Sequence, residues 1–343
     1  MPPCDIKYTK GDVKRAGEFL RKNLDSINIA EHNQAHEVLS YWRASHIIPM
    51  QAMIKSIRDK AYKIDPDAII VQRLKRTPSI ILKLKRENGM QLDRMEDIMG
   101  CRVVVASIKQ VKELRKLFKK WRTKHILQRE RDYLTYVKES GYRGIHLVYK
   151  YNGRHTSYHG RPIELQLRSR AQHSWATAVE VVGTFTKQTL KAGIGDDEWL
   201  SFFKLASIAF ADMENGRLTK NSDSIDRYNL REITEKLSVI EKLNAFASSI
   251  KHLGKGSNYP ADYYLLILNI ETNDVSFKEY NKKDLNDANK IYSQLEKKYG
   301  DDTKQDVVLV AASSLESLKK AYPNYFADTN IFSRNLQLVL DAK

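Results

Sequence analysis

The sequence predicts an α/β (α+β) protein in which a small mixed β-sheet is surrounded by helices and a small second domain follows. Long segments with apolar residues at helical spacing precede and follow three short segments of strand type. A stretch rich in turn-forming residues, 254–261, then separates the C-terminal part from the rest. The length of 343 residues suits two domains. We therefore expect domains at 1–253 and 262–343, joined by the linker 254–261.

Periodicity predicts the elements of the first domain. Apolar residues recur every three or four positions in 12–22 and 29–64, which indicates helices, and Pro49 predicts a kink in the second one. Clustered β-branched residues or alternation of apolar and polar residues predict strands at 101–106, 145–151 and 162–168. A helix with a basic outer face is expected over 108–124, and further helices from after Arg168 to about residue 253.

The C-terminal part has a pattern of ββαβα type. Two apolar segments, 263–270 and 275–280, flank the turn-forming residues 271–274 and predict a β-hairpin. A helix over 285–298, a strand over 306–312 and two more helices are expected to follow. This arrangement predicts a small compact module of normal domain size.

Composition excludes several classes of protein. The chain is 42% hydrophobic and 29% charged, which is ordinary for a folded, soluble protein. No apolar run reaches the roughly 18 residues that a membrane span needs, and the N-terminus lacks the apolar stretch of a signal peptide. The two cysteines, Cys4 and Cys101, cannot form a disulfide framework or a metal cluster by themselves. We expect a cytoplasmic monomer without a membrane partner.

Charge is unevenly distributed along the chain. The net charge is +16, but residues 262–343 contain 11 Lys and Arg against 13 Asp and Glu, a net of −2 that leaves +18 on residues 1–261. A basic body with a slightly acidic tail indicates an anionic partner for the body, such as a nucleotide or a nucleic acid. The alternative is that lysine-rich helix surfaces only keep the protein soluble.

Polar residues alternate with leucines in the segment Glu164-Leu-Gln-Leu-Arg168. On a strand, residues two apart share a face, so Glu164, Gln166 and Arg168 line one surface while the leucines enter the core. A carboxylate, an amide and a guanidinium in a row suit a surface where an anionic ligand and a cation meet. The alternative is a half-exposed edge strand.

A second carboxylate, Asp97, precedes Gly100 and the strand that begins at Cys101. Two carboxylates from different strands can hold one Mg²⁺, which prefers oxygen ligands and keeps several waters for substrate phosphates. Asp97 and Glu164 form such a candidate pair. The alternative is that Asp97 is a turn or cap residue.

A basic segment surrounds a Pro-Ser pair that can begin a helix. Arg73, Lys75, Lys83 and Lys85 bracket this pair, and Ser79 lies near the expected helix N-terminus. Helix N-termini and basic side chains bind phosphates. Because the chain has neither a Gly-Lys-Ser/Thr P-loop nor a GxGxxG motif, a triphosphate would be held here by side chains. The alternative is a solvated basic face.

A glycine-containing segment presents an aromatic residue between two donors. Glycines at 141 and 144 permit a tight loop that presents Tyr142 for base stacking, with Lys138 and His146 on either side as donors to phosphate or ribose. The alternative for His146 is a structural residue of a strand.

Taken together, the order and spacing of these four motifs resemble the synthetase domain of the RelA/SpoT family over about residues 40–185, with a mixed-sheet nucleotidyltransferase-like core. The resemblance implies transfer of the β,γ-diphosphate of ATP to a ribose 3′-hydroxyl with Mg²⁺. It assigns the adenine to Arg73 and Arg102, the ATP phosphates to Lys75, Ser79, Lys83 and Lys85, the metal to Asp97 and Glu164, and the acceptor to Lys138, Tyr142, His146, Gln166 and Arg168. Glu164 would also activate the attacking hydroxyl. The chain contains no His-Asp dipeptide, so the hydrolase half of the long family members is missing.

The C-terminal part carries a Tyr-x-x-Tyr motif, Tyr322 and Tyr325, and no zinc-ligand cysteines. In this respect the chain resembles the fused toxin–antitoxin members of the family called CapRel. The resemblance implies a pseudo-zinc-finger domain that folds back and blocks the ATP site, with the tyrosines near Arg73 and Arg102. It also implies release by a phage capsid protein. The alternative is that both tyrosines pack the core of the tail itself.

Two acceptors are compatible with these motifs. The resemblance to CapRel implies the 3′-terminal adenosine of the tRNA CCA end, whose modification would block aminoacylation. A basic helix that supplies Lys112, Arg115, Lys116, Lys119 and Lys120 for a tRNA backbone favours this acceptor. The other acceptor is GTP or GDP, with the alarmone (p)ppGpp as product. A third hypothesis is a non-catalytic RNA-binding regulator.

Overall fold

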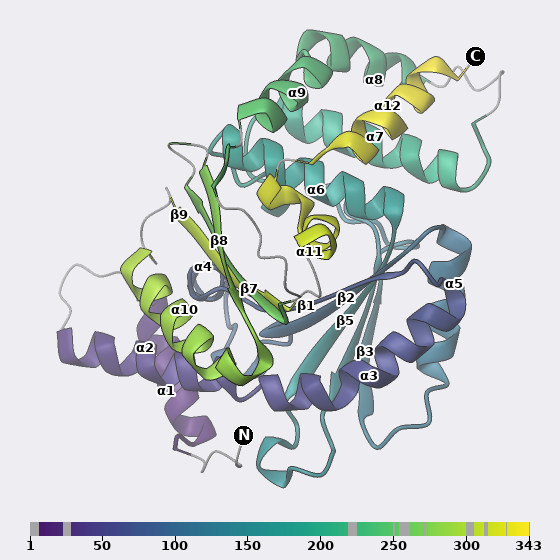
Figure 1. Cartoon of the computed structure of the whole chain (residues 1–343). Coiled ribbons are helices and arrows are strands. Elements are labelled where there is room, and N and C mark those ends of the chain that lie inside the picture. The colour runs from purple at the N-terminus through teal and green to yellow at the C-terminus, as the bar shows by residue number, and fades with distance from the viewer. Residues whose placement is uncertain are drawn as a thin grey trace.

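The computed structural model describes residues 7–22, 29–218, 225–249, 251–253, 261–269, 272, 274–299, 305–311, 315–326 and 328–342. Two β-sheets, one of five strands and one of four, form its framework, and helices lie around and between them (Figure 1). The linker expected at 254–261 lies outside the described residues except for Ala261. Among the described residues, no helix is both long and apolar enough to cross a lipid bilayer.

Three helices begin the chain: α1 (Lys10–Arg21), α2 (Ile29–Ala44) and α3 (Ile47–Ile64). The prediction of one kinked helix over 29–64 is therefore wrong, because the chain turns at residues 45 and 46 and starts a new helix. Pro49 lies in the first turn of α3, where its missing N–H has no helical acceptor to lose. Pro49 thus helps to begin a helix and does not kink one.

The larger sheet is mixed, as predicted, and its strand order is β1-β2-β5-β4-β3. Only β2 and β5 run parallel; the other neighbours are antiparallel. The strands are β1 (Ile69–Leu74), β2 (Met99–Val105), β3 (Ile126–Asp132), β4 (Ile145–Lys150) and β5 (Pro162–Ser169). Strands β1 and β3 were not predicted, because Gln and charged residues interrupt their apolar pattern. The edge-strand alternative for Glu164 is wrong, since β5 is the central strand.

The two faces of this sheet have different partners. One face packs on α3 and α5 (Ile108–Lys119) in an apolar cluster that contains Phe118, Leu165 and Leu167. Helix α5 ends at Lys119, earlier than the predicted 124, because Lys120 already caps it. The other face is bordered by α4 (Thr77–Arg86) and by α6 (Arg170–Phe185), which continues directly from β5. Pro78 in the first turn of α4 agrees with the expected helix start.

The remaining helices of the first part are α7 (Asp197–Glu214), α8 (Ile225–Lys236) and α9 (Val239–Ser249). They stand beside α6 at the upper end of Figure 1. Helix α6 begins with a capping box in which the Ser169 hydroxyl accepts from the amide of Gln172. Twelve residues of α6 are buried, so this helix lies in the interior of the molecule.

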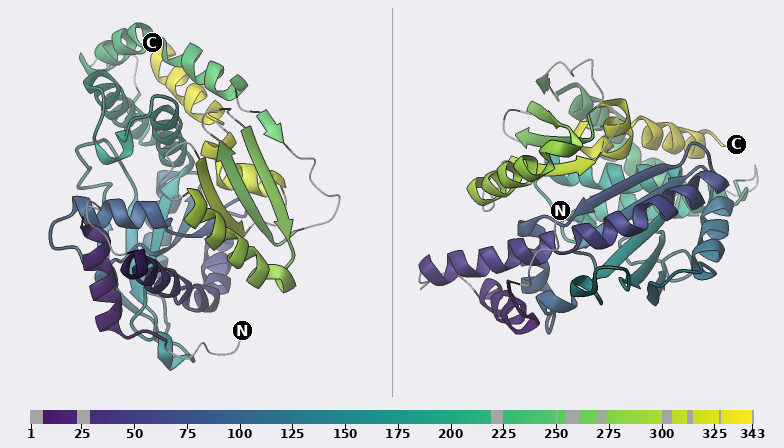
Figure 2. Two further views of the ribbon diagram at one scale, coloured as in Figure 1. Left: turned by 90° about the vertical axis from the view of Figure 1, so that its left-hand side faces the viewer. Right: turned by 60° about the horizontal axis from the view of Figure 1, so that its bottom comes forward.

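The smaller sheet has the order β6-β8-β7-β9. Its strands are β6 (Lys251–Leu253), β7 (Tyr263–Asn269), β8 (Asp274–Tyr280) and β9 (Gln305–Ala311), and β7 and β8 form the predicted hairpin. Strand β6, which falls in the range expected for the first domain, pairs with β8 in parallel. With α10 (Leu285–Tyr299), α11 (Leu315–Ala321) and the short turn Pro323–Phe326, these strands form what we call the C-terminal unit, the described residues of 251–326. The unit lies over β1 and α6 in the views of Figure 2.

The last helix, α12 (Asn330–Asp341), leaves the C-terminal unit and packs on α6, α7 and α8. Its stripe Phe332, Leu336 and Val339 joins the apolar cluster that holds Trp199 and Phe202. The expectation that the tail forms a self-contained module is therefore wrong for this helix. Periodicity identified the apolar stripe but could not show which surface it covers.

Candidate active site: two carboxylates in a cationic cavity

A cavity of about 1280 Å³ lies between the larger sheet, α4, α6 and the C-terminal unit. Most residues that the sequence assigned to ATP (the diphosphate donor), to the metal and to the acceptor line this cavity: Arg73, Lys75, Ser79, Lys83, Asp97, Arg102, Lys138, Tyr142, His146, Glu164, Gln166 and Arg168. Tyr322 and Tyr325 line it as well. Lys85 does not; its side chain is exposed on α4. The structure thus brings together side chains from distant parts of the chain, such as Arg73 and Tyr325.

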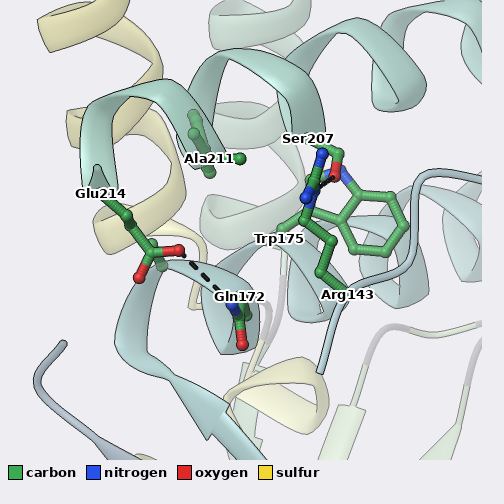
Figure 3. A pocket seen from close by; sticks show the side chains of 8 residues that line it. Arg143, Gln172, Trp175, Ser207, Ala211 and Glu214 are labelled. Atoms are coloured by element: carbon green, nitrogen blue, oxygen red, sulfur yellow. Dashed lines mark hydrogen bonds between the residues drawn. The ribbon is translucent and has the colours of Figure 1, made fainter. Parts of the chain in front are cut away.

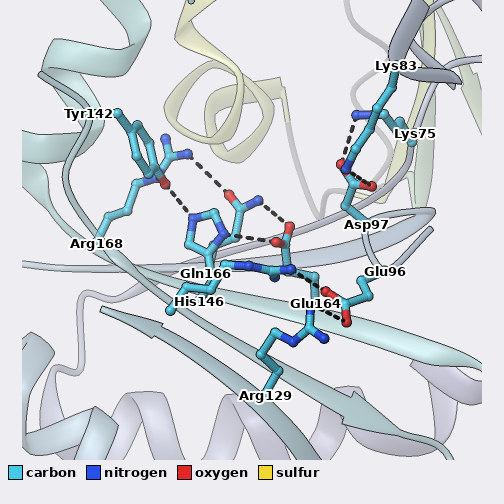
Figure 4. A network of polar contacts seen from close by, with 11 residues as sticks. Lys75, Lys83, Glu96, Asp97, Arg129, Tyr142, His146, Glu164, Gln166 and Arg168 are labelled. Carbon is cyan, nitrogen blue, oxygen red and sulfur yellow. Dashed lines mark hydrogen bonds and ion pairs between the residues drawn. The ribbon is translucent and has the colours of Figure 1, made fainter. Parts of the chain in front are cut away.

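A continuous chain of hydrogen bonds runs along the acceptor side of the cavity (Figure 4). His146 on β4 and Glu164 on β5 meet with 2.8 Å between Nδ1 and Oε1. The other ring nitrogen, Nε2, lies 2.6 Å from the Tyr142 hydroxyl, which also accepts from Arg168 Nε at 3.1 Å. Gln166 links the two ends of this chain into a ring of hydrogen bonds. Its amide nitrogen donates to Glu164 Oε2 at 2.7 Å, and its amide oxygen accepts from Arg168 at 3.2 Å. Glu164 is therefore held in one orientation.

The protonation of this network differs from that of free side chains. Burial would raise the pKa of Glu164, but His146 and Gln166 outweigh it and hold that pKa well below its usual range. Burial would likewise lower the pKa of His146, and Tyr142 and Glu164 raise it instead. Arg168 and His146 overcome burial and lower the pKa of Tyr142 to about 7. Glu164 is thus a carboxylate at neutral pH, paired with an imidazole that readily takes a second proton.

The loop that carries Tyr142 requires its glycines. Gly141 has φ +87°, in the left-handed region, and a Cβ there would lie 3.1 Å from the Cα of Lys204. The ring of Tyr142 is only 8% exposed and Lys138 Nζ lies 5.4 Å from its centroid. The loop is therefore as tight as the sequence predicted, but it buries the ring that was expected to stack on a base.

Asp97 lies two residues before β2 and is held by two lysines of the donor side. Its Oδ2 accepts from Lys75 Nζ at 2.9 Å and its Oδ1 from Lys83 Nζ at 3.0 Å (Figure 4). Burial raises the pKa of Asp97, but the two ammonium groups outweigh this effect and lower it. Asp97 does lie in the turn before β2, as the alternative expected, but a turn position alone does not account for these contacts, because both oxygens accept from lysines of the cavity.

The donor set of this cavity fits Mg²⁺. Asp97 and Glu164 line the same space and supply only oxygen ligands, and strand register places Gly100, three residues after Asp97, opposite Glu164. No cluster of three or more metal-ligating side chains is found among the described residues. A divalent cation would therefore complete its shell with water and substrate phosphates, as Mg²⁺ does in phosphate-transfer sites.

Cations crowd the donor end of the cavity. Burial and the neighbouring Arg168 lower the pKa of Arg102 to about 10, and Arg73 contributes to the same effect. Glu180 on α6, which sequence analysis missed, is an acidic group that faces them. It forms an ion pair with Lys191, and together with nearby tyrosines it outweighs burial and raises the pKa of the half-buried Arg73. The sequence did contain a feature that could have identified Glu180, because it is the one acidic residue of the largely buried helix Arg170–Phe185.

A second ion-pair cluster, also missed, lies on the acceptor side. Glu96 pairs with Arg131 Nη2 at 2.5 Å and with Arg129 Nη1 at 3.3 Å, and all three residues line the cavity (Figure 4). The residues belong to β3 and to the turn before β2. Because β3 itself was not predicted, nothing in the sequence showed that these arginines face the cavity.

The basic helix α5 lies on the opposite face of the sheet from the cavity. Lys112, Lys116 and Lys120 are exposed, whereas Arg115 pairs with Glu130 and Asp132, and Lys119 pairs with Glu130 at 2.8 Å. The structure therefore does not bring this set next to the acceptor residues.

A smaller pocket lies between α6 and α7 and is lined by Arg143, Gln172, Ser207 and Glu214, among others (Figure 3). Arg143 Nε donates to the Ser207 hydroxyl at 3.2 Å. Its free space of about 10 Å³ is that of a single water molecule. This pocket is too small for a nucleotide, whereas the large cavity has room for one and is the candidate active site.

Part of the chain is similar in sequence to known proteins. Residues 72–185 match the sequence model of the family described as "Region found in RelA / SpoT proteins". The chain is 35% identical over 118 residues to the GTP pyrophosphokinase YjbM of Bacillus subtilis (strain 168), which is 33% of this chain and 54% of that protein. The chain thus spans about half the length of this curated relative. The predicted resemblance to RelA/SpoT proteins over about residues 40–185 is confirmed for residues 72–185.

Two solved structures are similar to part of this chain. The small alarmone synthetase 1 from Bacillus subtilis, bound to its product pppGpp, has 22% identity and a TM-score of 0.44, and the match covers 52% of this chain and 94% of that chain. A GTP pyrophosphokinase family protein from Streptococcus pneumoniae has 24% identity and a TM-score of 0.42, with 60% and 98% covered.

Proposed function

We propose that the chain is an ATP-dependent pyrophosphokinase that transfers the β,γ-diphosphate of ATP to a ribose 3′-hydroxyl. The observation that carries this proposal is that Asp97 and Glu164 line the same cavity and lie there among cations. Phosphoryl transfer depends on positioning and charge neutralisation more than on covalent catalysis. The match to RelA/SpoT proteins supports the same reaction.

On the donor side, Arg73 and Arg102 would hold the adenine, while Lys75, Ser79 and Lys83 would hold the phosphates. Lys75 and Lys83 bond Asp97 in this structure, so they exchange that carboxylate for phosphate oxygens when ATP enters. Mg²⁺ held by Asp97 and Glu164 would supply neutralisation of the phosphate charge. The exposed position of Lys85 places it outside this set.

On the acceptor side, Glu164 would accept the proton of the attacking 3′-hydroxyl. The bond from this oxygen to the β-phosphorus forms as the bond from the β-phosphorus to the AMP oxygen breaks. The hydrogen bonds of His146 and Gln166 to Glu164 orient it for this step. Lys138, Tyr142 and Arg168 would bind the acceptor nucleotide around it.

As acceptor we propose the 3′-terminal adenosine of the tRNA CCA end, so that the product cannot be aminoacylated and translation stops. The net charge of +16 supports a polyanionic acceptor. The second candidate is GTP or GDP, with (p)ppGpp as product. It is favoured by the one curated relative described above, which is a GTP pyrophosphokinase.

We further propose that the C-terminal unit inhibits the enzyme and belongs to the pseudo-zinc-finger type of CapRel. Tyr322 and Tyr325 line the cavity beside the proposed adenine site, and burial, only partly opposed by nearby arginines, raises the pKa of both phenols, so they stay neutral. Release by a phage capsid protein bound to this unit rests on the resemblance to CapRel alone.

The test is a transfer assay with the full chain carrying Tyr325→Ala, Mg²⁺ and ATP radiolabelled at the γ-phosphate. Deacylated tRNA and GDP or GTP are offered in parallel, and a chain that also carries Glu164→Gln is the blank. Label on tRNA that disappears when the 3′-adenosine is removed supports the first acceptor. Label on the guanosine nucleotide alone identifies an alarmone synthetase. Tight tRNA binding without transfer of label would indicate the non-catalytic regulator.

A further inference from the structure

A buried ion pair joins the C-terminal unit to the first part of the chain behind the wall of the cavity. Arg43 on α2 and Glu296 on α10 are 4% and 8% exposed, and Arg43 Nη1 donates to Glu296 Oε2. The hydroxyl of Tyr292, also on α10, donates to Glu296 Oε1 at 2.7 Å and accepts from Arg43 Nη2 at 2.9 Å. In Figure 1, α10 lies alongside α2 and α4 at this contact.

The same ion pair contacts the first residue of α4. The amide of Thr77, the first residue of α4, donates to Glu296 Oε1 at 3.2 Å, and the preceding Arg76 makes no side-chain capping bond. A carboxylate from another part of the chain therefore satisfies a helix N-terminus that has no local cap. Helix α4 carries Ser79 and Lys83, two of the residues proposed for the ATP phosphates.

Arg43 also holds the segment that leads into α4. Its Nε donates to the backbone carbonyl oxygen of Lys75 at 2.9 Å, and its Nη1 donates to the Thr77 hydroxyl at 2.9 Å. Lys75 Nζ in turn bonds Asp97. The planar guanidinium thus holds the Lys75 carbonyl oxygen and the Thr77 hydroxyl, on either side of Arg76, with its fixed fork of donors, a geometry that a lysine ammonium does not reproduce.

We infer that Arg43 is a positioning residue for the phosphate-binding residues of β1 and α4, and that Glu296 is the anion by which the C-terminal unit controls it. This inference rests on the proposed function. When the unit moves away, Arg43 loses its buried counter-ion and α4 loses its cap. An anion, here a phosphate group of ATP, then restores both, so closure of the unit and nucleotide binding compete.

The experiment measures binding of α,β-methylene-ATP, in which the transferred diphosphate cannot leave, by calorimetry with the full chain. Glu296→Gln removes the anion and keeps the shape, and we expect the affinity to rise about tenfold or more. Glu316→Gln is the matched control, because Glu316 belongs to the same unit but lies in an exposed ion pair with Lys320. Hydrogen exchange at residues 75–79 should become faster in Glu296→Gln and slow again when the nucleotide is added.

Arg43 is tested in the background of Glu296→Gln. Adding Arg43→Lys should lower the affinity for α,β-methylene-ATP about tenfold relative to Glu296→Gln alone, although the charge is kept. Two results would overturn the inference: Glu296→Gln that binds like Glu316→Gln, or Arg43→Lys that leaves the affinity unchanged. If Glu296→Gln does not fold, Tyr292→Phe, which removes only the hydroxyl shared by both ions, replaces it with the same expected direction. Binding needs no transfer, so failure of the proposed reaction leaves this test intact.

Discussion

The hydroxyl of Tyr322 donates a hydrogen bond to the backbone carbonyl oxygen of Gln72, with 3.1 Å between the two oxygens. Gln72 immediately precedes Arg73 on β1, and the Tyr322 ring is 3% exposed. This contact fastens the C-terminal unit to the strand that supplies the proposed adenine-binding arginine. Closing the unit and covering the donor end of the cavity are therefore one structural event.

Tyr322→Phe removes this bond and keeps the ring. We expect the free energy of unfolding to fall by about 1 kcal/mol, because a partly buried carbonyl oxygen loses a partner. Urea denaturation measures the change, with Tyr62→Phe as control, since Tyr62 is 47% exposed. Equal loss in the two variants would show that the Tyr322 bond does not stabilise the closed unit.

Tyr325→Ala should raise transfer activity. The ring is 4% exposed in the apolar cluster that joins the C-terminal unit to Val71 and Val181, so its removal weakens closure. We expect a rise of about tenfold or more in initial rate at low ATP. Tyr228→Ala, at a side chain that is 69% exposed, should change nothing. A rate below that of the unaltered chain, with the fold intact, would contradict an inhibitory role.

Phe332→Ala should destabilise the whole protein, because this residue of α12 packs against the first part of the chain. Phe332 is fully buried against Phe202, Phe203 and Phe210 of α7. We expect a loss of about 3–5 kcal/mol in the free energy of unfolding. Leu338→Ala on the same helix is the control, because Leu338 is 53% exposed. For the same reason, a chain cut before α12 would expose this aromatic cluster and is a poor test of inhibition.

The sequence was sufficient for most of the sheet and much of the site, for identifiable physical reasons. Strict alternation in Glu164-Leu-Gln-Leu-Arg168 put the polar side chains on one face and the leucines in the core, as the structure has them. The start of α4 followed from Pro78. These are local rules, in which the cause lies within a few residues of the effect.

What could not be predicted depends on contacts between distant segments. Arg43 and Glu296 lie 253 positions apart, and neither belongs to a motif. The apolar stripe of α12 is visible in the sequence, but its docking on α7 is not. Glu180 is a single acidic residue in a buried helix, and only the fold shows that it faces arginines from β1 and β2.

The ion pair of His146 and Glu164 should give stability a defined pH dependence. Glu164 has a lowered pKa in the folded protein, so its contribution is present above its ordinary value of 4.5 and is lost as the pH falls through the folded value. His146 has a raised pKa, so its contribution is complete below 6.5 and is lost as the pH rises through the folded value. The two ranges overlap between pH 4.5 and 6.5.

We therefore expect the free energy of unfolding of the unaltered chain to exceed that of Glu164→Gln most between these pH values. Urea denaturation from pH 4 to 9 measures the difference. Tyr142 and Arg168 on the other side of the ring are common to both proteins, and their direct effect largely cancels in the comparison. A difference that does not change with pH would mean that the charge of the pair does not stabilise the fold.

Asp97→Asn should separate nucleotide binding from catalysis. The carboxylate neutralises Lys75 and Lys83, so the amide leaves two lysine charges free for phosphate oxygens. Affinity for ATP measured without Mg²⁺ should therefore stay the same or increase. The transfer rate with Mg²⁺ should fall at least about a hundredfold, because one of two oxygen ligands for the cation is lost. Asp59→Asn on the exposed face of α3 is the control. Loss of ATP binding together with transfer would instead assign Asp97 to holding the two lysines in place, and retained transfer would exclude it from the metal site.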